Sequence, residues 1–122
     1  MTQIERAFVN IREGQVHLRR SVGADPGTQP PLWMIHASPA SSVSLVGLMQ
    51  ELGRTRRVIA PDTLGNGDSA PAAPAVPDIP YYADSSLRVM DALGIERVDL
   101  YGSHTGAHIV SEMAIARPDR FR

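Results

Sequence analysis

Hydrophobic and polar positions divide the chain into short apolar runs and longer amphipathic stretches. Apolar residues alternate or cluster over residues 6–11 and 15–22, on either side of a polar turn at 12–14, and this pattern predicts a β-hairpin. Residues 32–36 carry apolar side chains on both faces, as a central strand of a parallel sheet requires. Residues 57–60 and 98–101 predict two further strands.

Apolar residues at helical spacing separate these strands. The first predicted helix has Ser42 as its N-cap, an apolar stripe over 43–52 and Gly53 at its end. The second covers 82–93 before Gly94, and the third covers 105–116, where Pro118 stops it. Residues 25–31 and the proline-rich residues 70–80 are loops by composition. The alternation of strand and helix predicts an α/β fold with a parallel sheet and right-handed crossovers.

Composition and charge exclude several classes of partner. The chain has 122 residues, enough for one small domain with a core. Its net charge of −1 gives no reason to expect nucleic acid or an anionic membrane surface as a partner. It has no cysteine, so disulfides, thiolate nucleophiles and cysteine metal sites are excluded. The N-terminus shows no secretory pattern, no apolar run approaches the ~20 residues of a membrane helix, and we expect a cytoplasmic protein without a cofactor.

The most specific motif lies at residues 102–106. An apolar run ends in Gly102, and Gly106 opens the third predicted helix, with Ser103, His104 and Thr105 between them. Small residues at this spacing are the frame of a nucleophile elbow, G-x-Nu-x-G, a sharp turn from strand to helix. The nucleophile position is occupied by His104, where a hydrolase normally has Ser, Cys or Asp. The strain of such a turn predicts a positive φ at His104.

Two further segments accompany the elbow. The predicted strand at 32–36 enters a His-x-x-Pro turn from His36 to Pro39. The predicted strand at 57–60 is followed, after Pro61, by D-x-x-G-x-G-x-S beginning at Asp62. In this order and spacing, the three motifs resemble the N-terminal half of the α/β-hydrolase superfamily over about residues 5–122. The resemblance implies an incomplete α/β-hydrolase fold, with a leading β-hairpin followed by parallel βαβ units. Residues 1–122 would form a single partial domain that lacks the second half of the fold. Residues 33–35 would be a central strand between 58–60 and 98–100.

The resemblance also implies roles for residues around the elbow. Backbone N–H groups of Thr105 and of the Ala37–Ser38 turn would form an oxyanion hole. Ala37 stands where the family usually has glycine, so a turn that needs positive φ would be less permissive. His104 is the candidate catalytic residue, as a base or as a nucleophile that forms an acyl-imidazole, or it is a vestigial or binding residue. Ser103 is an alternative nucleophile, one position out of frame.

Other polar clusters have plainer interpretations. The loop from Asp62 is chiefly structural, with Gly65 and Gly67 at positive φ, because it lacks the Lys-Ser/Thr pair and the spacing of a phosphate loop. Residues 104, 108 and 112 are His, His and Glu, a spacing that can hold a metal. That spacing is more typical of a polar helix face, so we expect no metal site.

The order of the motifs limits the predicted function. In this fold the triad acid and base follow the nucleophile, and no residue after His104 comes from the later strand ends that supply them. The sequence therefore predicts a hydrolase of a small ester, lactone or related carbonyl substrate, truncated before the acid and base and inactive by itself. The alternative is a non-catalytic binding or interaction module. An exposed sheet edge at 98–101 predicts self-association.

Overall fold

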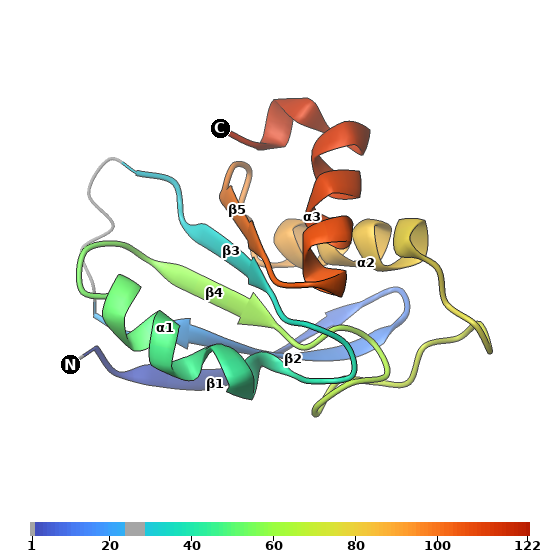
Figure 1. The fold of residues 1–122 in the computed structure, drawn as a ribbon, viewed down its shortest axis with the longest axis horizontal. Coiled ribbons are helices and arrows are strands. Elements are labelled where there is room, and N and C mark those ends of the chain that lie inside the picture. The colour runs from blue at the N-terminus through green and yellow to red at the C-terminus, as the bar shows by residue number, and fades with distance from the viewer. Residues whose placement is uncertain (1, 24–28) are drawn as a thin grey trace.

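The structure is a computed structural model, and it describes residues 2–23 and 29–122. The loop expected at 25–31 lies mostly outside these residues. Along the chain, the strands are β1 (Ile4–Ile11), β2 (Gly14–Ser21), β3 (Leu32–Ile35), β4 (Val58–Pro61) and β5 (Asp99–Gly102). The helices are α1 (Val46–Leu52), α2 (Ile79–Ala92) and α3 (Thr105–Ala116), with short 3₁₀ turns at Ser42–Leu45 and Pro118–Arg120 (Figure 1).

The described strands form a mixed sheet in the order β1-β2-β4-β3-β5. β1 and β2 are an antiparallel hairpin paired from Ile4↔Ser21 to Ile11↔Gly14, as the sequence predicts. β2 also runs antiparallel to β4, whereas β3 is parallel to both β4 and β5. The prediction that residues 33–35 lie between 58–60 and the strand entering the elbow is confirmed. This topology is the incomplete α/β-hydrolase fold that the three motifs imply.

Alternating side chains of the strands fill two hydrophobic cores, one on each face of the sheet. Trp33, Ile35 and Ile59 belong to the core shared with α2 and α3, and Trp33 is fully buried with its indole N–H donating to Ser86 Oγ. Met34 belongs to the other core, which α1 covers. The motif loops follow β3, β4 and β5, and the carboxyl ends of these parallel strands meet at one edge of the sheet, where open α/β sheets bind ligands.

The predicted start of the first helix is wrong by one residue. Ser41 is the cap of the 3₁₀ turn, with extended backbone and an Oγ that accepts the Val43 N–H, and α1 follows from Val46. Ser42 is instead buried and engaged elsewhere, since its N–H donates to Asp62 and its hydroxyl accepts from Arg19. α3 covers the predicted residues, and α2 ends before Gly94, which has a positive φ. α2 begins earlier than predicted, at Ile79 within the expected loop, because the Asp78 side chain caps it by accepting the Tyr81 N–H.

The expected exposed edge at 98–101 is partly covered. β5 is the last strand of the described sheet, but Val98 is fully buried, and it forms a parallel bridge with Phe121 on the free side. The interpretation of Val98 as an exposed edge residue is therefore wrong, because the chain returns after α3 and pairs with it. Asp99 to Gly102 remain at the edge, and self-association through them stays a prediction. Among the described residues, no helix is long and apolar enough to cross a membrane.

Candidate active site

The turn between β5 and α3 has the geometry of a nucleophile elbow. β5 ends at Gly102, and α3 begins at Thr105. His104 lies between them with φ 54° and ψ −114°, and it is the only non-glycine residue with positive φ in the described part of the chain. The positive φ predicted for His104 is confirmed. A residue in this sparsely populated region projects its side chain away from both strand and helix and persists only where its surroundings force it.

Close backbone packing supplies that force. A Cβ atom built on Gly102 would overlap the carbonyl of Gly106, and one built on Gly106 would overlap the carbonyl oxygen of Ile35 at the end of β3. The Ser103 N–H also donates to the Ile35 carbonyl, at 3.2 Å. The two glycines predicted from the elbow frame are therefore required by space, since they let the first turn of α3 lie directly against β3 and β5.

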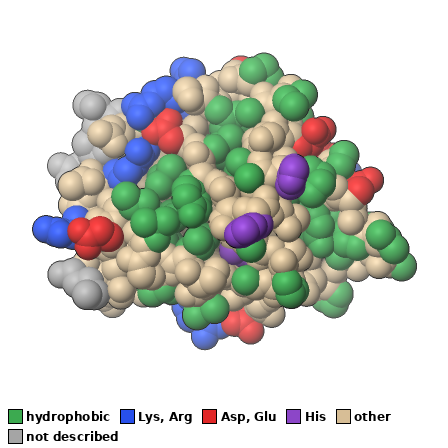
Figure 2. All heavy atoms as spheres, in the orientation of Figure 1, with side chains coloured by type: hydrophobic (Ala, Val, Ile, Leu, Met, Phe, Trp, Pro, Cys, Tyr) green, Lys and Arg blue, Asp and Glu red, His purple; other side chains and the backbone are tan. Residues whose placement is uncertain are grey.

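The His104 side chain is exposed and makes no hydrogen bond to any described residue. It lies at the carboxyl end of β5. Because β3 and β5 are parallel, the turn after β3 lies at the same edge of the sheet. His108, one helical turn further along α3, is also exposed. Figure 2 shows histidine side chains on the surface near the start of α3, beside apolar side chains that gather near α1 and β4. The imidazole of His104 is therefore accessible to solvent, and it is not hydrogen-bonded within the described residues.

The predicted oxyanion donors lie around the same turn. Among the hydrogen bonds between described residues, none uses the N–H of Ala37, Ser38 or Thr105 as donor. The contact of Gly106 with the carbonyls of Ile35 and His36 brings the residue before Gly106 close to the turn that follows His36. Ala37 does not have a positive φ, so alanine in place of glycine causes no backbone strain at this position.

His36 anchors the turn after β3. Its side chain is buried, with an exposed fraction of 1%. The Thr63 N–H donates to His36 Nε2 at 3.0 Å, so Nε2 is the acceptor and Nδ1 carries the proton. Nδ1 lies 2.7 Å from the carbonyl oxygen of Ala37 and donates to it. Burial lowers the pKa of His36 below its ordinary value, which keeps the ring neutral.

The loop after β4 is organised around the Asp62 carboxylate. Oδ1 accepts from Ser42 N–H at 2.8 Å, and Oδ2 accepts from Asp68 N–H at 3.0 Å. Burial by itself raises the pKa of Asp62, but hydrogen bonds from Ser42, Asp68 and His17 outweigh it, and the pKa is lowered. Gly65 and Gly67 have φ values of 84° and 53°, as predicted. This loop is structural, because its carboxylate is fully engaged.

The sequence gives no indication of the partner of Asp62 on β2. His17 is fully buried, and its Nδ1 lies 2.8 Å from Asp62 Oδ2. Arg6 donates to His17 Nε2 at 2.8 Å and pairs with Asp68 at 2.6 Å. A histidine in a strand of a hairpin has no local feature that marks it as buried against a loop 45 residues away.

The side chains that lie close enough together to hold a metal are not those at positions 104, 108 and 112, whose spacing in the sequence is compatible with a metal site. Within residues 2–23 and 29–122, the ligand atoms of His17, Asp62 and Asp68 lie within 4.8 Å of one another. The buried atoms of this group are already hydrogen-bonded within the protein, and the Arg6 guanidinium lies among them. His104, His108 and Glu112 form no such group among the described residues.

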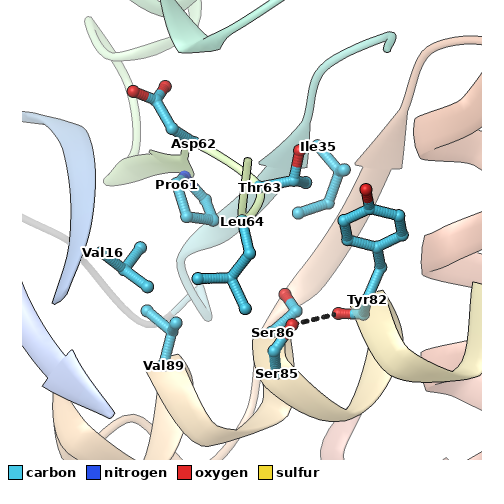
Figure 3. A pocket seen from close by; sticks show the side chains of 10 residues that line it. All are labelled: Val16, Ile35, Pro61, Asp62, Thr63, Leu64, Tyr82, Ser85, Ser86 and Val89. Carbon is cyan, nitrogen blue, oxygen red and sulfur yellow. Dashed lines mark hydrogen bonds between the residues drawn. The ribbon is translucent and has the colours of Figure 1, made fainter. Parts of the chain in front are cut away.

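A small cavity lies between the end of β4 and α2 (Figure 3). Leu64 and Val89 point into it, and Tyr82 lies at its other side, with the Tyr82 carbonyl accepting from Ser85 Oγ. It holds about 10 Å³, about the space of one water molecule, and its lining is apolar. This cavity is too small for a substrate, so the exposed edge around His104 is the better candidate site.

Comparison with known proteins agrees with this geometry. Residues 30–122 match the family described as alpha/beta hydrolase fold. The chain belongs to the alpha/beta hydrolase fold family. Within that family it is 41% identical over 101 residues to a 2-hydroxymuconate semialdehyde hydrolase from Pseudomonas sp. (strain CF600), an alignment that covers 80% of this chain and 36% of the relative.

Other α/β-hydrolase relatives have different substrates in their names. An epoxide hydrolase 3 from Siraitia grosvenorii is 32% identical over 124 residues, covering 100% of this chain and 38% of the relative. The crystal structure of the N-acyl homoserine lactonase AidH complexed with N-butanoyl homoserine superposes with a TM-score of 0.82 at 32% identity, covering 94% of this chain and 42% of that one. The chain thus spans about two fifths of the length of these relatives.

Proposed function

We propose that this chain provides the elbow half of a hydrolase that acts on a small ester, lactone or related carbonyl substrate. The observation that carries the proposal is the exposed His104 at positive φ, held at the nucleophile position by Gly102 and Gly106. The names of the relatives support hydrolysis of small molecules, including a lactone. The free N–H groups of Ser38 and Thr105 support a substrate with a carbonyl that becomes an oxyanion.

The chemistry available to His104 is acyl transfer to its imidazole. A neutral ring nitrogen attacks the carbonyl carbon, and the carbonyl electron pair moves onto oxygen, which the backbone N–H groups stabilise. The oxyanion electron pair then re-forms the carbonyl as the C–O bond to the leaving group breaks, the alkoxide takes a proton from water, and the acyl-imidazolium loses its one N–H proton to solvent. Water finally attacks the acyl-imidazole, which releases the acid and returns the histidine.

The described residues contain no partner that would activate the water of this last step. No acid or base among residues 2–23 and 29–122 forms a hydrogen bond or ion pair with the His104 side chain, so release of the acyl group depends on unassisted water. We therefore expect acylation without efficient turnover from this chain alone. The alternative proposal, a non-catalytic binding module, is favoured by the absence of a hydroxyl or carboxylate nucleophile at position 104.

Pre-steady-state kinetics with p-nitrophenyl acetate separates the two proposals. The acylation proposal expects up to one equivalent of nitrophenol in a fast phase, followed by slow release. His104→Ala abolishes the fast phase. His108→Ala is the matched control, because it removes an exposed histidine from the first turns of α3, just after the elbow, and leaves the fast phase unchanged. A fast phase that survives His104→Ala, or that is absent from the unaltered chain, contradicts the acylation proposal and favours the binding module.

A further inference from the structure

We infer that His36 is a positioning residue that sets the direction of the Ser38 N–H group by holding the carbonyl of Ala37. This inference rests on the proposed function, in which Ser38 donates to the substrate oxyanion. His36 itself does not face the elbow as a reacting group, because both of its ring nitrogens are engaged within the protein. Its effect on the substrate would come only from the orientation of the peptide between Ala37 and Ser38.

The first step is the tautomer of His36. A backbone N–H is always a donor, so the contact of Thr63 N with Nε2 fixes Nε2 as the acceptor. The ring proton is therefore on Nδ1, which is 2.7 Å from the Ala37 oxygen. The Thr63 hydroxyl lies 3.3 Å from Nε2 and itself accepts from the Asn66 side-chain amide at 2.7 Å. These contacts give the ring one orientation and one tautomer.

The second step is the geometry of the peptide between Ala37 and Ser38. In the described residues the cis peptide bond joins Ser38 to Pro39, so the Ala37–Ser38 bond is trans. The carbonyl and the N–H of a trans peptide point in opposite directions within one plane. When His36 Nδ1 holds the Ala37 carbonyl, the Ser38 N–H must point away from His36. The Ala40 N–H also donates to the Ala37 carbonyl, at 2.9 Å, so His36 provides one of two hydrogen bonds that hold this peptide plane. Loss of the His36 bond leaves the plane less firmly fixed.

Two substitutions separate the two hydrogen bonds of His36. In His36→Asn, the side-chain amide nitrogen occupies the place of Nδ1, so it can donate to the Ala37 carbonyl, while the acceptor for Thr63 is lost. In His36→Gln, the side-chain oxygen occupies the place of Nε2 and can accept from Thr63, while the donor to Ala37 is lost. Each variant loses one buried hydrogen bond, so a merely structural role predicts similar losses of stability and similar effects on the site.

The test measures the peptide and the chemistry in the same three proteins. Carbonyl ¹³C and amide ¹⁵N resonances of the Ala37–Ser38 peptide report the hydrogen bond to the Ala37 carbonyl, and a long-range ¹H–¹⁵N spectrum reports the Nδ1–H tautomer. We expect His36→Asn to keep both resonances and the p-nitrophenyl acetate burst rate near those of the unaltered chain. We expect His36→Gln to shift both resonances and to slow the burst, by no more than the roughly 10²-fold that loss of one oxyanion donor causes, because the Ala40 N–H still holds the Ala37 carbonyl.

Each alternative outcome is decisive. Equal resonance shifts in both variants, or a burst slowed equally in both, overturn the positioning role. An Nε2–H tautomer overturns it as well, because Nδ1 would then have no proton to donate. If the fast phase does not depend on His104, the proposed acylation fails. The resonances of the two His36 variants then still decide whether His36 orients the peptide.

Discussion

The loop after β4 and the elbow after β5 follow strands that run parallel to β3, and each contains two glycines, yet they are stabilised by different means. The loop is held by a side chain, because the Asp62 carboxylate accepts hydrogen bonds from Ser42, Asp68 and His17. The elbow is held by backbone packing, with Gly106 against the Ile35 carbonyl. As a result, the Asp62 carboxylate is buried and its oxygens are occupied by hydrogen bonds within the protein, whereas the His104 side chain is exposed to solvent.

Replacement of an elbow glycine is expected to have the largest effect. Gly106→Ala forces a Cβ atom into the Ile35 carbonyl, which cannot move without disturbing β3, so we expect a loss of about 3 kcal/mol in the free energy of unfolding. Gly47→Ala is the control, because Gly47 lies in α1 with open space around it and should gain about 0.5–1 kcal/mol. Urea denaturation measures both. Equal effects of the two substitutions would contradict the packing argument.

A change to the Asp62 carboxylate is expected to be next in size. Asp62→Asn keeps the shape of the side chain but places an amide NH₂ against groups that are themselves donors. At least one buried N–H then loses its acceptor, and we expect a loss of about 2–3 kcal/mol in unfolding free energy. Asp119→Asn, on an exposed carboxylate paired with Arg117, should leave the stability unchanged. If thermal unfolding shows Asp62→Asn to be neutral, the loop is not held by its carboxylate.

Acid should weaken the protein in two separate steps. The pKa of His36 is lowered by burial, so the unfolded chain takes up this proton first as the pH falls below its ordinary value of 6.5. Stability then decreases until the lower folded pKa is reached. The pKa of Asp62 is also lowered, so a second decrease begins below its ordinary value of 3.8.

Denaturation at a series of pH values measures these steps, and His36→Gln isolates the first. The variant has no imidazole at this position, so its stability should fall less between neutral pH and pH 5 than that of the unaltered chain. Identical pH dependence of the two proteins would show that His36 is not buried in its neutral form. This effect is expected to be the smallest of the three.

The elbow was predictable from the sequence because its signature is local, although the carbonyl against which Gly106 packs belongs to β3. Gly102 and Gly106 lie next to the residue that they constrain, and the strained turn needs both. The order of the parallel strands was predicted from the family resemblance, whereas the extent of α3 and the C-terminal end of α2 follow from periodicity and from breaking residues within each segment. The resemblance predicted which backbone N–H groups face the elbow as candidate donors, but it did not predict the hydrogen bonds by which His36 holds the turn.

The contacts that the sequence did not predict are those between distant segments. The pairing of His17 with Asp62 requires β2 to lie beside β4, and no local pattern specifies that a histidine of the hairpin faces the loop. The same contact network explains the misplaced cap, because Asp62 and Arg19 engage Ser42 and leave Ser41 to cap the turn. The pairing of Val98 with Phe121 likewise depends on where the chain returns after α3.

Localisation of an acyl group tests the central claim, that the elbow frees His104 for chemistry beside backbone oxyanion donors. The chain is mixed with p-nitrophenyl acetate, quenched within the fast phase and analysed by peptide mass spectrometry. His104 and His108 are both exposed on adjacent turns, so each molecule contains its own control. We predict that the acetyl group is on His104 and that it is absent from His108. Equal labelling of both, or labelling of Ser103 in place of His104, would contradict the account.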